Sequence, residues 1–165
     1  MNIFYLSNDP RKCAEYHVDK HVVKMILEYA QLLSTTHRIL DTNLESSMDD
    51  NLYKATHRNH PSAIWVRQSA SNYRWLYTLW LELLDEYTFR YGKQHASGRL
   101  IDHLANLPKN ISTMAQFTEP TPAMPDQYKV AGDSAQSYHN YYNGDKRRMF
   151  AWKNRDVPYF ITGEL

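Results

Sequence analysis

Hydrophobic and polar positions alternate with the period of an α-helix between residues 10 and 36. The apolar positions of this stretch, which fall on one helix face, are Ala14, Val18, Val22, Met25, Tyr29, Leu32 and Leu33. Asp9 and Pro10 are typical of a helix start, because Asp can cap the first turn and Pro lacks an N–H that this turn leaves unbonded. The pattern predicts one helix from Pro10 to about Thr36.

A second long helical pattern begins near Ser71 and ends at Gly92, a residue that favours the end of a helix. Its broad apolar face, which should be central to the core, consists of Trp75, Leu76, Leu79, Trp80, Leu83, Leu84 and Tyr87. Shorter helices are expected from Pro61, within residues 96–107 and over residues 133–148. Because no two-residue period persists beyond a few positions, we predict an all-α fold of about four to six helices.

The remaining segments have the composition of connections. Residues 41–56 are acidic and polar and are expected to be irregular. The proline-rich segment 108–125 should form a long irregular crossing that packs through Ile111, Met114 and Phe117. With 165 residues, of which 42% are hydrophobic, the chain is expected to form a single compact domain over residues 1–165.

Composition and motifs limit where the protein is expected to be located and which cofactors it is expected to use. The single cysteine, Cys13, cannot form an intramolecular disulfide and is expected to be a small packed side chain. We find neither a signal peptide nor an apolar run of about 18 residues, so we expect a cytoplasmic protein without a membrane partner. No phosphate-binding glycine loop, dinucleotide fingerprint or paired CxxC occurs, and we expect no cofactor. The net charge of +1 leaves nucleic-acid binding to a local patch.

Four ionisable residues, His17, His21, Lys24 and Glu28, share one stripe of the first predicted helix. The stripe is either a solvated flank or the edge of a groove, where histidine meets phosphate and a carboxylate acts as general acid or base. Two histidines four residues apart can also bind a metal ion. That third hypothesis adds His57, His60 and an acidic partner, Asp19 or Glu28. We favour it least, because the metalloprotease motif has glutamate after its first histidine, where this chain has Val18.

Two further segments are candidates for contact with phosphate. Residues 57–60, His-Arg-Asn-His, precede a proline-initiated helix, where Asn59 or His60 can cap the turn and Arg58 can meet a phosphate. Residues 137–160 contain five basic and two acidic side chains, a balance of +3, interleaved with aromatic residues. This composition suits either a helix that completes the core or a surface on which bases stack and phosphates bind.

The order of these features resembles that of a known family. The chain begins with the pattern M-x-I-F, continues with KMILEYAQLL in its first helix and has Asn59-His60-Pro61 in a turn, followed by an aromatic helix that ends in Arg90-Tyr91-Gly92. Over residues 1–95, and more weakly in the aromatic and basic C-terminus, this resembles the pyrimidine-dimer DNA glycosylases of the endonuclease V type and their phage-encoded relatives.

The resemblance implies an all-α enzyme that cleaves the glycosidic bond of a damaged pyrimidine with its own N-terminal amine. In that family the amine attacks the anomeric carbon to form an imine, and β-elimination then nicks the strand. A helix glutamate assists, and basic residues hold duplex DNA with an extruded base. An α-amino group suits this role because it titrates near neutrality.

Transferred to this chain, the resemblance implies catalytic roles for Met1 or Asn2 and for Glu28. Asn2 is bulky, so Met1 is expected to remain, whereas family members usually expose a small residue. Where the family has an Arg-Glu pair this chain has Lys24-Met25, and Glu28 follows one turn later, about 5 Å along the axis. Both departures leave the lyase step open.

The resemblance also implies that His17 is a phosphate contact. The full set of expected DNA-binding residues is His17, His21, Lys24, Arg58, Asn59, His60, Lys146, Arg147, Arg148, Trp152, Lys153 and Arg155. The leading hypothesis is a metal-free DNA glycosylase, with or without lyase activity, located in the host cytoplasm if phage-encoded. The alternatives are a non-catalytic phage accessory module that binds nucleic acid or a host protein, and the His-ligated metal-dependent hydrolase.

Overall fold

The computed structural model describes residues 1–165, and they form seven α-helices and three 3-10 helices without any β-strand. The α-helices are α1 (Pro10–Tyr16), α2 (Asp19–Leu40), α3 (Ser46–Asn51), α4 (Pro61–Val66), α5 (Ala70–Tyr91), α6 (Ile101–Leu104) and α7 (Ser134–Asp145). The 3-10 helices are η1 (Ala96–Leu100), η2 (Asp126–Tyr128) and η3 (Arg147–Met149). The prediction of an all-α fold is confirmed, with one helix more than expected. None of the helices has the length and apolar character needed to cross a membrane.

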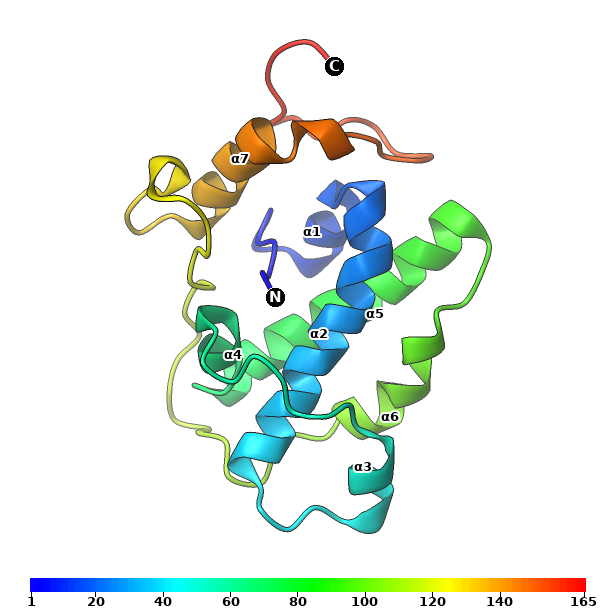
Figure 1. Cartoon of the computed structure of the whole chain (residues 1–165), viewed down its shortest axis with the longest axis vertical. Helices are drawn as coiled ribbons and strands as arrows, with labels where there is room; N and C mark the ends of the chain where they lie inside the picture. Colours follow the sequence, from blue (N-terminus) through cyan, green and yellow to red (C-terminus); the bar gives the residue numbers. More distant parts are fainter.

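Helices α2 and α5, each of 22 residues, form the centre of the molecule. They cross in Figure 1, where α7 and the C-terminal segment form one end of the molecule and α3 lies at the other. Trp80 of α5 is wholly buried at this crossing, and its indole N–H donates to the carbonyl of Ile26 in α2 at 3.0 Å. Gly92 ends α5 in the left-handed conformation at φ 66°, as its position in the sequence predicted.

The predicted helix from Pro10 to Thr36 is two helices, because His17 and Val18 adopt extended conformations between α1 and α2. The break persists because Arg90 of α5 donates to the carbonyl of His17 at 2.8 Å and to that of Glu15 at 2.9 Å. These carbonyls would otherwise be unbonded at the end of α1. Apolar periodicity continues across the break, so the pattern alone could not reveal it.

Other expectations about the connections were also partly wrong. Residues 41–56 contain α3, and the last helix ends at Asp145 before a 3-10 turn. In the proline-rich segment, Ile111 is buried and Phe117 packs edge-on against Trp65, but Met114 is 91% exposed. The segment is anchored on both sides of Met114. Before it, the carbonyl of residue 112 accepts from the Ala70 N–H; after it, residue 118 bonds to Trp65 and Asn72. The chain between these anchors is exposed.

The first residues of the chain are buried although they belong to no sheet. Residues 3–6 are each at most 3% exposed and run alongside α1 and α7 (Figure 1). A buried backbone must be hydrogen-bonded, and here side chains supply the partners. The Phe4 N–H donates to the Tyr29 hydroxyl at 3.0 Å, while Cys13 accepts from the Leu6 N–H at 3.4 Å and donates to the Phe4 carbonyl at 3.1 Å.

Cys13 is a packed side chain, as expected, since it is wholly buried, and this burial raises the pKa of its thiol to about 12. The thiol therefore keeps its proton and can donate it. On the other side of the segment, the ring of His139 in α7 donates to the Leu6 carbonyl at 2.7 Å. The N-terminal segment is thus held by side chains from α1, α2 and α7.

Three buried histidines predict how stability depends on pH. Burial lowers the pKa of His17 to about 4, of His21 to about 2 and of His37 to about 4. As the pH falls below about 6.5, the unfolded chain takes up protons that the folded chain refuses. We therefore expect the free energy of unfolding to fall between pH 6.5 and 4, by up to about 1.4 kcal/mol per pH unit for each histidine.

Urea unfolding at half-unit intervals from pH 7.5 to 4.5 measures this dependence. Replacing the exposed His57 with Gln is the matched control, and it should leave the slope unchanged. A free energy of unfolding that stays constant below pH 6.5 would contradict the prediction.

Candidate active site

The chain's amino group lies beside a carboxylate. The nitrogen of Met1 is 3.7 Å from Oε1 of Glu28, whose side chain is 17% exposed. The side chain of Met1 is only 2% exposed, whereas the residue as a whole is partly exposed, so its solvent-accessible part is the main chain with the amino group. The amine and the carboxylate are therefore both partly open to solvent.

The buried N-terminal segment explains this position. Glu28 and Tyr29 are consecutive residues of α2, so their side chains point in different directions. Tyr29 points inward and holds the Phe4 N–H, while Glu28 points outward to the amino group. Asn2, which follows Met1 in the chain, accepts a hydrogen bond from the hydroxyl of Tyr138 in α7 at 3.3 Å. The residues next to the amine are therefore held by α2 on one side and by α7 on the other.

His60, at the start of α4, lies within electrostatic reach of this pair. Partial burial lowers the pKa of His60, and electrostatic interactions with the amino terminus and with His57 lower it further, while Glu28 opposes them. Nδ1 of His60 accepts from the Ser62 N–H at 3.0 Å, so the neutral ring has its proton on Nε2. The structure thus groups the amine, Glu28 and the histidine-proline turn, and the residue that caps this turn is His60.

His17 does not share this surface. Its ring is wholly buried, with Nδ1 donating to the Cys13 carbonyl at 2.6 Å and Nε2 accepting from the Tyr29 hydroxyl at 2.9 Å. Both ring nitrogens are therefore occupied inside the protein. The phosphate contact that the resemblance implied for His17 does not fit this burial, and the stripe of four ionisable residues begins one turn later than predicted.

His21 is 4% exposed, and its Nδ1 lies 2.8 Å from the hydroxyl of Tyr142 in α7. Nowhere in the chain do three or more His, Cys, Asp or Glu side chains come together in a group that could hold a metal ion. Asp19, one proposed acidic ligand, is instead bonded to Arg90 at 3.0 Å. The hypothesis of a His-ligated metal site built from His17, His21, His57 and His60 therefore has no structural support.

The other predicted DNA-binding residues fall into two groups. The side chains that face solvent, at least in part, are Lys24, Arg58, Asn59, Lys146, Arg148 and Lys153. Three others are engaged within the protein: Trp152 donates to the Tyr16 carbonyl at 2.9 Å, Arg147 bonds the carbonyls of residues 162 and 164, and Arg155 binds Glu86. The aromatic and basic C-terminus therefore both completes the fold and presents charge.

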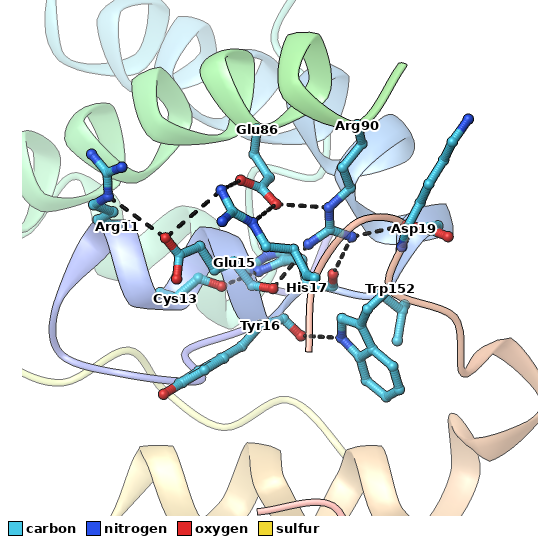
Figure 2. A network of polar contacts seen from close by, with 12 residues as sticks. Arg11, Cys13, Glu15, Tyr16, His17, Asp19, Glu86, Arg90 and Trp152 are labelled. Atoms are coloured by element: carbon cyan, nitrogen blue, oxygen red, sulfur yellow. Dashed lines mark hydrogen bonds and ion pairs between the residues drawn. The ribbon is translucent and has the colours of Figure 1, made fainter. Parts of the chain in front are cut away.

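Sequence reasoning missed the ion-pair network in Figure 2, which joins α5 to the break between α1 and α2. Arg90 is 2% exposed and pairs with Glu86 at 2.7 Å and with Asp19 at 3.0 Å. Arg155, in the C-terminal segment, pairs with the other oxygen of Glu86 at 2.9 Å. Burial alone would raise the pKa of Glu86, but its bonds to Arg155 and Arg90 lower it below the usual value. The i, i+4 spacing of Glu86 and Arg90 was the available signal.

Comparison with protein families gives one match. Residues 1–97 match the model of a family described as pyrimidine dimer DNA glycosylase. The matched part contains Met1, Glu28, His60 and Arg90, and it ends shortly after α5. No curated protein and no solved structure matches the chain.

The network predicts a large effect of removing Arg90. Arg90→Met would leave the buried Glu86 with one partner fewer and the carbonyls of Glu15 and His17 unbonded, so we expect a loss of about 3–5 kcal/mol in the free energy of unfolding. Urea unfolding measures this loss. Arg74→Met, at an exposed position of the same helix, is the matched control and should cost less than about 0.5 kcal/mol. Equal effects of the two substitutions would show that the network contributes little.

Proposed function

Because the chain belongs to the pyrimidine dimer DNA glycosylase family, we propose that it excises a damaged or modified pyrimidine from DNA with its N-terminal amine. The observation that carries the proposal is the 3.7 Å separation between the Met1 nitrogen and Glu28 Oε1. Family membership supports action on DNA, and this geometry supports the choice of nucleophile. The glutamate that the resemblance left one turn out of register is the one beside the amine.

The chemistry requires a nucleophile, a departing base and a proton acceptor. The uncharged amine attacks C1′ of the deoxyribose, and the electron pair of the glycosidic bond leaves with the pyrimidine. The attached nitrogen then loses a proton, for which the Glu28 carboxylate is the nearest acceptor. Glu28 then returns this proton to O4′ as the C1′–O4′ bond opens, which gives a protonated imine. In the lyase step a base, for which the Glu28 carboxylate is again available, removes a proton from C2′, and the C3′–O bond breaks with the 3′-phosphate as leaving group.

The exposed cations support binding of a polyanion around this centre. Lys24 lies one turn before Glu28 on α2, and Arg58 and Asn59 precede His60 at the start of α4. We assign these three residues to the DNA contact, together with Lys146, Arg148 and Lys153. His17, Arg147, Trp152 and Arg155 are left out, because their polar groups are bonded within the protein.

Borohydride trapping tests the amine. On duplex DNA containing a pyrimidine dimer or an abasic site, the wild-type protein should give a covalent adduct, because borohydride reduces the imine to a stable amine. Adding Gly-Ser before Met1 moves the amine away from Glu28 and should abolish the adduct. Intact-mass measurement identifies the attached residue. Absence of an adduct on every lesion, with DNA binding preserved, would instead indicate a non-catalytic binding module.

Glu28→Gln tests the proton acceptor. We expect turnover to fall at least about 100-fold, since general acid–base catalysis contributes about 10²–10⁴. The melting temperature should change little, because the Glu28 side chain is partly exposed. Glu45→Gln, at an exposed position outside the site, is the matched control. Full activity of Glu28→Gln would remove this residue from the mechanism.

A further inference from the structure

His21 has an N–H group that no protein atom accepts. The buried Tyr142 hydroxyl accepts from the Val18 N–H at 3.2 Å, and Nδ1 of His21, 2.8 Å away, is its one available acceptor, so we assign its proton to that bond. The neutral ring of His21 must then have its proton on Nε2. Nε2 has no hydrogen-bond partner within the protein, yet it is not one of the fully buried polar atoms. It therefore reaches solvent, although the residue as a whole is 96% buried.

The ring of His21 is held rigidly. It stacks on Phe4 with ring centroids 4.1 Å apart and an interplanar angle of 23°, and it lies 5.5 Å from the ring of Tyr142. Phe4 is itself fixed in the buried N-terminal segment by Tyr29. The N–H of His21 is therefore a donor with a fixed direction, which costs little to order when a ligand binds.

Two lysines place positive charge around this donor. Lys146, at the end of α7, has its ammonium 4.8 Å from the ring centre of Tyr141 and 6.0 Å from that of Phe4. Lys24 follows His21 by three residues on α2 and is exposed. After burial and His17, the charges of Lys146 and Lys24 also lower the pKa of His21. Neither lysine has a carboxylate partner within 4.0 Å.

We propose that His21, Lys24 and Lys146 form an anion site between α2 and α7 that holds one phosphodiester group of the DNA backbone. The N–H of His21 donates to a phosphate oxygen in a fixed direction, and the two ammonium groups balance the charge. Tyr141 is a positioning residue, because its ring keeps the ammonium of Lys146 near His21.

The position of this site rests on the proposed function. Lys24 and Glu28 are four residues apart on α2, which corresponds to about 6 Å along the helix axis. The phosphate is therefore expected within about two nucleotides of the sugar that the amine attacks, since phosphates of one strand are spaced by about 3.4 Å along the duplex axis. The site would fix the damaged strand relative to Met1.

Binding measurements with neutral phosphates test the site. The probe is a duplex with a tetrahydrofuran abasic analogue, in which each phosphate on either side is replaced in turn by an uncharged methylphosphonate. We expect one replacement to weaken binding of the wild-type protein about 10-fold. That same replacement should have less than a twofold effect on Lys146→Gln, because this variant has already lost the contact.

Matched variants separate this contact from general electrostatics. His21→Asn keeps an acceptor for Tyr142 but has no N–H at the position of Nε2, and it should lose sensitivity to the same methylphosphonate. Tyr141→Leu should behave like Lys146→Gln, whereas Tyr141→Phe keeps the ring and should behave like wild type. Lys153→Gln should bind more weakly overall yet remain sensitive, and melting temperatures verify that each variant folds.

The inference is overturned if the methylphosphonate weakens Lys146→Gln and His21→Asn as much as wild type, or if the wild-type protein does not bind the duplex. Failure of the proposed function is recognised separately. Binding with a single sensitive phosphate but no borohydride adduct would retain the anion site and refute catalysis by the amine. A borohydride adduct without any sensitive phosphate would support catalysis by the amine and refute the anion site.

Discussion

The structure depends on one constraint, which is that a buried backbone outside regular secondary structure must find hydrogen-bond partners. Residues 3–6 lie inside a helical protein without a neighbouring strand, and side chains supply their partners: Tyr29 at Phe4, Cys13 at Phe4 and Leu6, and His139 at Leu6. Each of these side chains is itself buried. Together they fix the start of the chain, and the amino group lies beside Glu28 as a consequence.

The same constraint explains the break between α1 and α2. There the carbonyls of Glu15 and His17 would be unbonded, and the guanidinium of Arg90 bonds both of them. A buried guanidinium needs negative charge nearby, which Glu86 and Asp19 provide. Arg155 adds a second cation on Glu86 and so ties the C-terminal segment to α5. The ion-pair network of Arg90, Glu86, Asp19 and Arg155 therefore has a structural role.

This division of labour separates two kinds of ionisable residue in the first 30 positions. His17 is neutral and completes the hydrogen bonds of Cys13 and Tyr29 inside the core. Glu28 faces the amino group and solvent. His21 combines both roles, because one ring nitrogen is bound to Tyr142 and the other reaches solvent. The catalytic proposal rests on the Glu28 carboxylate beside the amine, and the anion site rests on Nε2 of His21. In both cases the unoccupied atom matters more than the residue type.

The sequence by itself determined the all-α fold, the cap at Asp9, the helix start at Pro61 and the end of α5 at Gly92, because these depend on residues close together in the chain. The family resemblance also paired the amino terminus with Glu28, and the structure places the two 3.7 Å apart. Only the tertiary structure decided which polar groups are free. Arg90 is 73 positions from His17 and Tyr142 is 121 positions from His21, and no local pattern encodes contacts between residues so distant.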